Sequence, residues 1–125
     1  MAKTVSGLLL SFALLLGLSL YEIFYITSTL NRFRDATIGL FQRTEEHRAT
    51  HEDGNALRLL WEHEKRSLHI WLPHTAIENV DYHLNEALGY LYQDNYEDAL
   101  PKLEVIIDMS ENILRSIALL PENIF

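Results

Sequence analysis

A long apolar run near the N-terminus constrains this chain more than any other feature. Residues 5–26, VSGLLLSFALLLGLSLYEIFYI, are apolar almost throughout, and Glu22 is the single charged residue among them. A helix rises about 1.5 Å per residue, so a run of this length can cross the roughly 30 Å hydrocarbon layer of a membrane while satisfying its own backbone hydrogen bonds. The run predicts a transmembrane helix that tethers the rest of the chain.

Two other interpretations compete with a retained anchor. Lys3 followed by leucines is also typical of a cleaved signal sequence, and a helix that is apolar on every side can be a buried core helix. No A-x-A cleavage pattern follows Leu20, and bulky Tyr21, Phe24 and Tyr25 stand where a signal peptidase requires small residues. Aromatic residues suit a membrane interface, and the rest of the chain is too short to enclose an all-apolar helix. We therefore favour the anchor.

The remaining sequence has the size and composition of one small domain. The chain has 125 residues, of which 48% are hydrophobic, and this is enough for a core beyond the anchor. We expect an N-terminal tail (residues 1–4), a transmembrane helix (residues 5–26) and a helical bundle domain (residues 27–125). The absence of cysteine excludes disulfides and thiolate metal sites.

The net charge of −8 is concentrated in the last third of the chain. Residues 78–125 contain ten aspartates and glutamates against only Lys102 and Arg115. Such a surface repels phosphate backbones, so we expect no nucleic-acid partner. A solvated helical face that aids solubility is the simplest interpretation of this acidity.

Apolar residues recur every three to four positions after the anchor, which indicates helices and no strand. The first helix is expected to continue to a polar break, HEDG, that ends at Gly54. The second helix, capped by Asp53 or Asn55, is expected to end by Leu72, because Pro73 disfavours helical geometry in the residue before it.

Two further helices complete the expected fold. The third lies between Pro73 and a short turn at Asp94 and Asn95, and the fourth ends before Pro121. Pro101 requires that the fourth helix either starts late or is kinked. These helices predict an all-α fold, in which a transmembrane helix extends into a small antiparallel bundle with three further helices. The expected core residues are Leu57, Trp61, Leu68, Trp71, Ile77, Val80, Leu84, Leu88, Leu91, Leu103, Ile106, Leu114 and Ile117.

One face of the anchor has the features of a helix–helix contact in lipid. At about 100° per residue, six residues share this face: Gly7, Ser11, Leu14, Leu18, Glu22 and Tyr25. Small side chains let helices approach closely, and an ionisable group near a membrane commonly faces protein or water. We interpret this partner face as a candidate contact with another integral membrane protein. The alternative stays open that Glu22 only reaches headgroups and that the anchor is a plain tether.

Histidines and carboxylates are the candidates for metal or catalytic chemistry. His47 and His51 are four residues apart but lie where the helix is expected to end, and Asn55 and Ser67 break the H-E-x-x-H zinc pattern. The other histidines, His63, His69, His74 and His83, form no motif, and no nucleophile motif or phosphate-binding glycine loop is present. We expect no enzyme activity, no cofactor and no metal site.

A short segment resembles part of a known repeat. Residues 86–108, EALGYLYQDNYEDALPKLEVIID, resemble the middle of a tetratricopeptide repeat, with Gly89, Tyr92, Tyr96 and Ala99 in the usual order. The turn is shorter than in the repeat, and a single copy cannot bury its own apolar face. We interpret the segment as a helical hairpin.

Several features recur together along nearly the whole chain. They are Lys3 before a leucine-rich anchor, Trp61 followed by Trp71, the acidic IENVD stretch at residues 77–81, a hairpin around Asp94, and a final PENIF. As a set they resemble an uncharacterised family of small, single-pass, all-helical membrane-anchored proteins of spore-forming Gram-positive bacteria. That family has no assigned activity. The resemblance implies architecture, a cell-membrane location, an exported C-terminal domain and association with a larger multi-pass membrane protein.

The expected function is a non-enzymatic, membrane-anchored helical interaction module that is accessory to a larger membrane protein. The alternative is a ligand- or metal-sensing helical domain that uses the tetratricopeptide-like hairpin or a His/carboxylate site. Two rules conflict on orientation. Arg32, Arg34 and Arg43 follow the anchor and favour a cytoplasmic domain, whereas Lys3 before a signal-like run favours an extracytoplasmic one. The resemblance decides for the extracytoplasmic side.

Overall fold

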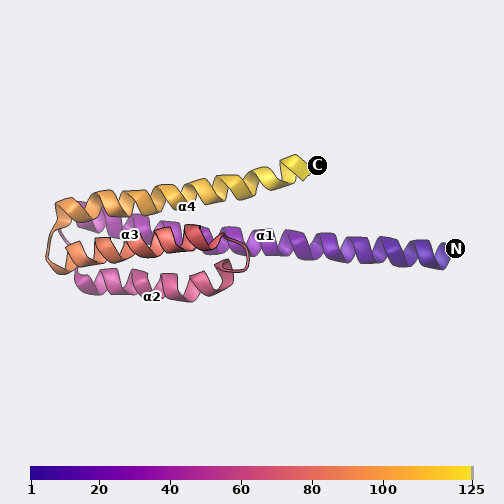
Figure 1. Cartoon of the computed structure of the whole chain (residues 1–125), viewed down its shortest axis with the longest axis horizontal. Coiled ribbons are helices and arrows are strands. Elements are labelled where there is room, and N and C mark those ends of the chain that lie inside the picture. The colour runs from indigo at the N-terminus through magenta and orange to yellow at the C-terminus, as the bar shows by residue number, and fades with distance from the viewer. Residues whose placement is uncertain (125) are drawn as a thin grey trace.

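Four helices account for nearly all of the chain. The computed structural model describes the backbone of residues 1–124 and the side chains of residues 1–118. In that part the elements are all helices, with no strand: α1 (Ala2–Glu45), α2 (His51–Leu68), α3 (His74–Tyr92) and α4 (Tyr96–Ile124). Each helix packs against two others, α1 and α3 both contacting α2 and α4, so the four form an up-down-up-down bundle (Figure 1). The expected all-α bundle is confirmed.

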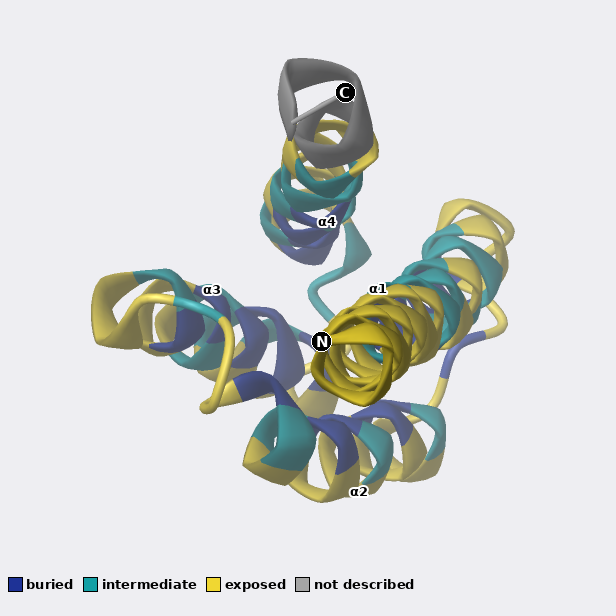
Figure 2. Cartoon of the chain, turned by 90° about the vertical axis from the view of Figure 1, so that its right-hand side faces the viewer, coloured by how far each residue is buried: buried dark blue, intermediate teal, exposed yellow. Residues whose placement is uncertain are grey.

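The first helix is much longer than the bundle that it enters. α1 has 44 residues and runs without interruption for about 66 Å. Most of its first half projects beyond the other helices, of which α4 reaches furthest in the same direction (Figure 1). From Ile26 onward, one face of α1 is buried in the core (Figure 2). The projecting half is long and apolar enough to cross a membrane, although an N-terminal signal sequence has the same length and composition.

The first helix ends earlier than the sequence pattern suggests. α1 stops at Glu45, His47 adopts a positive φ of 59°, and α2 begins directly after Thr50. The Thr50 hydroxyl accepts a hydrogen bond from the Asp53 N–H at 3.2 Å, and the Asp53 carboxylate accepts one from the Thr50 N–H at 3.0 Å. This capping box satisfies backbone donors at the start of α2. The expected break at HEDG is therefore wrong, as is the N-cap at Asp53 or Asn55.

Gly54 is a packing residue and not a turn residue. It is buried in the first turn of α2, and a Cβ at this position would overlap the Leu88 side chain on α3. The missing side chain lets α2 approach α3 closely.

The expected end of α4 before Pro121 is wrong, and of the two alternatives at Pro101 the late start does not occur. α4 starts at Tyr96 and continues through Pro101, and its backbone remains helical past Pro121 to Ile124. Pro101 is exposed, so its ring lies at the bundle surface and the helix loses one backbone hydrogen bond there without burying the gap. α2 ends at Leu68, within the limit set by Pro73, which caps α3.

Most of the expected core residues are buried between the four helices. Ten of them are less than a tenth exposed: Leu57, Trp61, Leu68, Ile77, Val80, Leu84, Leu88, Leu91, Leu103 and Ile106. Leu114 and Ile117 are half-buried and pack against that core. α1 adds Ile26, Leu30, Phe33 and Leu40, with the Phe33 and Trp61 rings 4.7 Å apart.

Trp71 is the exception, because it is 48% exposed. α2 ends three residues before it, so Trp71 lies in the α2–α3 turn and no longer follows the apolar stripe of α2. Its assignment to the core is wrong.

Three buried threonines on α1 find hydrogen-bond partners, whereas one buried carboxylate oxygen of Glu86 accepts no hydrogen bond from the described residues. On α1, the Thr29, Thr37 and Thr44 hydroxyls donate to the carbonyl four residues earlier at 2.7–2.9 Å. These bonds let threonine replace an apolar residue on a buried helix face.

A second polar group joins α2 to α3. The Trp61 indole N–H donates to Asp81 at 2.5 Å, and the Lys65 ammonium lies 3.4 Å from the same carboxylate oxygen. Burial alone would lower the pKa of Lys65, but its hydrogen bond to Glu62 and the attraction of Asp81 outweigh burial and raise that pKa above its ordinary value.

Candidate functional site

The end of the bundle from which α1 projects is apolar and incompletely filled. The α2–α3 turn lies at this end (Figure 1). It packs against α1 and α4 around a cavity of about 210 Å³ that is lined by Ser19, Glu22, Ile23, Ile26, Trp71, Leu72 and Ile117. A second cavity of about 430 Å³ shares Trp71, Leu72 and Ile117 and opens between the start of α3 and α4.

Large apolar side chains are exposed at this level of the molecule. In the turn, Ile70 is 76% and Trp71 48% exposed, and on α1, Tyr21 and Phe24 are 66% and 71% exposed. We call these four residues the apolar collar. The apolar periodicity does not point to Ile70, and it places Trp71 wrongly in the core. The signal that could have found both is a pair of large apolar residues directly before Pro73, where a helix must be ending.

The partner face of α1 divides into two parts. Gly7, Ser11, Leu14 and Leu18 are exposed, and a Cβ on Gly7 would meet no other atom within 4 Å. The other two residues meet this chain's own bundle: Glu22 lines the cavity beside Trp71, and the Tyr25 hydroxyl lies 3.2 Å from the Ser67 hydroxyl of α2.

The same side of α1 continues into its contact with α2. Arg32, which lies 3.4 Å from Glu64 of α2, falls seven residues after Tyr25 and so shares its side of the helix. The exposed residues Gly7 to Leu18 therefore lie in line with α2, and a helix packed on them would run towards the α2–α3 turn.

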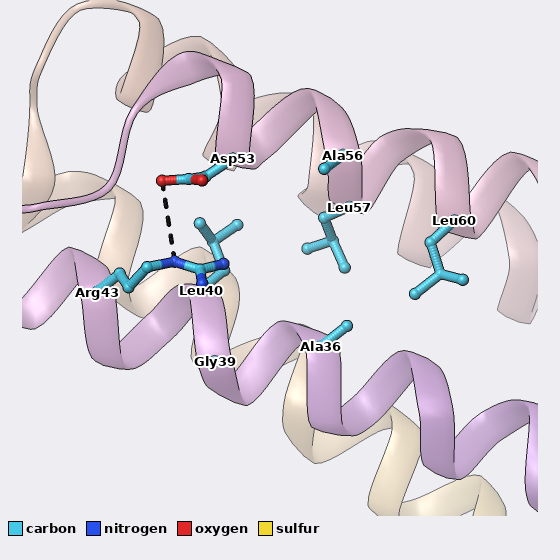
Figure 3. A pocket seen from close by; sticks show the side chains of 8 residues that line it. All are labelled: Ala36, Gly39, Leu40, Arg43, Asp53, Ala56, Leu57 and Leu60. Carbon is cyan, nitrogen blue, oxygen red and sulfur yellow. Dashed lines mark ion pairs between the residues drawn. The ribbon is translucent and has the colours of Figure 1, made fainter.

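A groove between α1 and α2 extends this side further (Figure 3). Ala36 and Gly39 of α1 face Ala56 of α2 across a cavity of about 310 Å³, and an ion pair between Arg43 and Asp53 at 3.8 Å closes one end. The small side chains leave the space open, and no other feature of the groove indicates a ligand.

Four of the six histidines lie at the ends of the bundle, whereas His63 and His83 lie within α2 and α3. His47 lies in the α1–α2 turn and stacks on Tyr96, while His51 begins α2 and meets the edge of Tyr92. The two histidines therefore do not share a helix face. Within residues 1–118, whose side chains are described, no group of three or more histidines and carboxylates is arranged to hold a metal ion. The other pair, His69 and His74, stacks beside the α2–α3 turn.

These features define an all-helical protein in which one long apolar helix continues without a break into a four-helix bundle. Its sequence matches the family described as Domain of unknown function (DUF4363) over residues 21–124, and the chain belongs to this family. The match confirms the expected membership of an uncharacterised family. It begins at Tyr21, so it covers the bundle and the apolar collar and leaves most of the apolar run outside. No protein with a curated description and no solved structure matches the chain.

Proposed function

We propose that this protein is a non-enzymatic, single-pass membrane protein whose helical bundle serves as an interaction module for a larger integral membrane protein. One observation carries the proposal: α1 passes without a break from an exposed, apolar half into the packed bundle. Apolar side chains exposed around a whole helix are stable when lipid or another protein covers them. Because the helix is continuous, it holds the bundle at a fixed distance from the membrane.

The proposal requires that the apolar run is retained in the mature protein. Aromatic Tyr21, Phe24 and Tyr25 occupy the region where signal peptidase would cut, and they favour retention. Intact-protein mass spectrometry of the membrane fraction should find the N-terminus at or near Met1. A mature N-terminus between residues 21 and 28 would overturn the anchor.

In this proposal the protein lies in the cell membrane of a spore-forming Gram-positive bacterium, with its bundle outside. The resemblance of the sequence to such proteins supports this location and orientation. External protease should remove the bundle from intact spheroplasts. Protection until the cells are lysed would instead place the bundle in the cytoplasm.

The partner is proposed to pack on the exposed part of the partner face, where Gly7 and Ser11 leave the α1 backbone accessible. The variant Gly7→Leu/Ser11→Leu should lose copurification of a membrane partner after mild detergent extraction. Its matched control, Ser6→Leu/Ala13→Leu, adds the same side chains to a different face of the helix and should retain the partner.

The comparison between the two double variants decides the partner contact. Both must reach the membrane in equal amounts, as measured by flotation. If the partner copurifies equally with both double variants, the anchor inserts into the membrane but does not contact the partner through Gly7 and Ser11.

A further inference from the structure

The apolar collar lies where the uncharged part of α1 ends. No charged residue occurs between Lys3 and Glu22, and this stretch rises about 28 Å as a helix, close to the roughly 30 Å of membrane hydrocarbon. Trp71 lines the same cavity as Ser19 and Glu22. When α1 spans a membrane, the α2–α3 turn is therefore held at the membrane surface.

The two ends of the bundle differ in what their turns expose. The turn of residues 46–50, at the end far from the projecting helix, exposes Glu46, His47 and Arg48. The α2–α3 turn exposes Ile70 and Trp71, and it is tightly built, with the Trp71 and Leu72 N–H groups both donating to the Leu68 carbonyl. At the far end the large exposed side chain is Tyr92, at the end of α3, and it carries a hydroxyl. The α2–α3 turn instead exposes isoleucine and tryptophan within the turn itself, which matches a molecule with this end against lipid and the other in water.

We propose that Ile70 and Trp71 insert into the interfacial layer of the same membrane that α1 crosses. This second contact rests on the proposed anchor and adds a lipid-binding role to the bundle itself. Tryptophan is favoured at that depth because its ring is apolar while its N–H can bond to headgroups and water. Exposed Arg66, in the last turn of α2, is placed to meet lipid phosphates.

The arrangement of the collar favours lipid over a protein partner. At 100° per residue, Phe24 points about 160° away from Ile26, which lines the cavity beside Trp71. The collar thus surrounds α1 at one level instead of following one of its faces. A partner helix covers one face of α1, whereas a membrane surface meets every side at the same depth.

The consequence is a bundle fixed at two points. The uninterrupted α1 sets the distance of the bundle from the membrane, and the inserted turn prevents it from tilting about the membrane exit of α1. The surfaces offered to a partner then keep a constant orientation.

The absence of cysteine allows a direct test with the full-length chain. Ile70→Cys and Leu59→Cys form a matched pair, because both positions are large, apolar and about equally exposed, at 76% and 70%. Phe12→Cys reports the anchor. Each variant carries an environment-sensitive fluorophore and is reconstituted, at low protein density and without other proteins, into phosphatidylcholine–phosphatidylglycerol vesicles that contain lipids with nitroxide quenchers at a shallow or a deep position.

The expected result is that shallow quenchers reduce the fluorescence of the label at position 70 and deep quenchers reduce that of the label at position 12. The label at position 59 should lose little fluorescence with either quencher. Quenching at Phe12 without quenching at Ile70 would overturn the second contact while the anchor stands. No quenching at Phe12 would instead refute the anchor. Equal quenching at Ile70 and Leu59 would mean that the bundle lies on the membrane without a specific docking site, and this also overturns the proposal.

A measurement without labels repeats the test. The chain has two tryptophans, buried Trp61 and exposed Trp71. Brominated lipids should quench part of the wild-type tryptophan fluorescence, and Trp71→Phe should abolish that part while leaving the melting temperature unchanged. If Trp71→Phe retains the quenched part, or if Trp71 is screened from water only when a membrane partner is added, the turn does not insert into lipid.

Discussion

The two halves of α1 differ in exposure and in how their apolar residues are distributed around the helix. In the first half, every residue to Tyr21 is exposed, and leucine and phenylalanine occur on all sides. In the second half, a single buried face containing Leu30, Phe33 and Leu40 lies opposite charged and polar residues. The backbone is one continuous helix through both halves. The halves differ only in their side chains, which are apolar on all sides in the first half and on one side in the second.

This difference separates what stabilises each half. The second half packs against two neighbouring helices, α2 and α4, so it should unfold with the bundle. The first half meets the bundle only at its end, where Ser19 and Glu22 line the cavity beside Trp71, and the stability of the rest depends on what surrounds it. The same substitution should therefore change the stability of the bundle when it is made in the second half of α1 and leave it unchanged when it is made in the first half.

The largest effect is expected when the bundle is disrupted and the first half is left alone. Leu84 is 1% exposed at the centre of α3, so Leu84→Asp buries a carboxylate without a partner. The cost is several kcal/mol, comparable with the roughly 5–15 kcal/mol stability of a small domain. The full chain in detergent should lose its near-ultraviolet circular dichroism and its cooperative melting, yet still float with membranes in cells.

Leu59→Asp is the matched control, because Leu59 is 70% exposed on α2. It introduces the same charge into a helix and should leave the melting transition in place. A folded Leu84→Asp bundle would contradict the core assignment, and loss of membrane association would contradict the independence of the two halves.

Two phenylalanines on α1 compare its halves directly. Phe33 is fully buried against Trp61, whereas Phe12 is 65% exposed. Phe33→Ala should lower the free energy of unfolding of the bundle by about 3–5 kcal/mol, because it leaves a cavity in a packed core. Phe12→Ala should leave that free energy unchanged. Chemical denaturation in a mild detergent, followed by the tryptophan signal, measures both, and equal effects would refute the separation.

Much of the bundle could be predicted from sequence, because the core depends on repeated apolar spacing. Val80, Leu84, Leu88 and Leu91 follow a helical period that no other structure explains, and the structure buries all four. Such a pattern is averaged over several turns, so one ambiguous residue does not change it.

The helix ends could not be predicted as well, because each depends on a few local bonds. The HEDG segment resembles a break, but polar residues are equally suited to a first helical turn once Thr50 supplies the cap. The apolar collar was harder still to predict, since it depends on the fold bringing Trp71 to the same cavity as Glu22 across a long sequence separation. Periodicity contains no information on that contact.

An ion pair between α1 and α2 allows a test with a smaller expected loss of stability than Phe33→Ala. Arg32 lies 3.4 Å from Glu64, whose side chain is only 5% exposed. Arg32→Leu removes the arginine from a buried carboxylate and should cost about 1–3 kcal/mol of bundle stability. Arg34→Leu is the control, because its partner Asp35 is 68% exposed and such surface pairs contribute about 0–1 kcal/mol. Similar losses in denaturation midpoints for both variants would show that the Glu64 pair adds nothing.

The smallest effect compares two glycines, one in each half of α1. Gly17 and Gly39 are both helical, and a Cβ at either position would meet no atom within 4 Å. Alanine is favoured over glycine in a helix by about 0.5–1 kcal/mol, because it loses less backbone freedom on folding. Residue 39 becomes disordered when the bundle unfolds, so Gly39→Ala should raise the melting temperature of the detergent-solubilised chain by about 2–8 °C. The first half remains helical within the detergent micelle throughout that transition, so Gly17→Ala should leave the melting temperature unchanged. An equal rise for both variants would mean that the halves of α1 unfold as one unit.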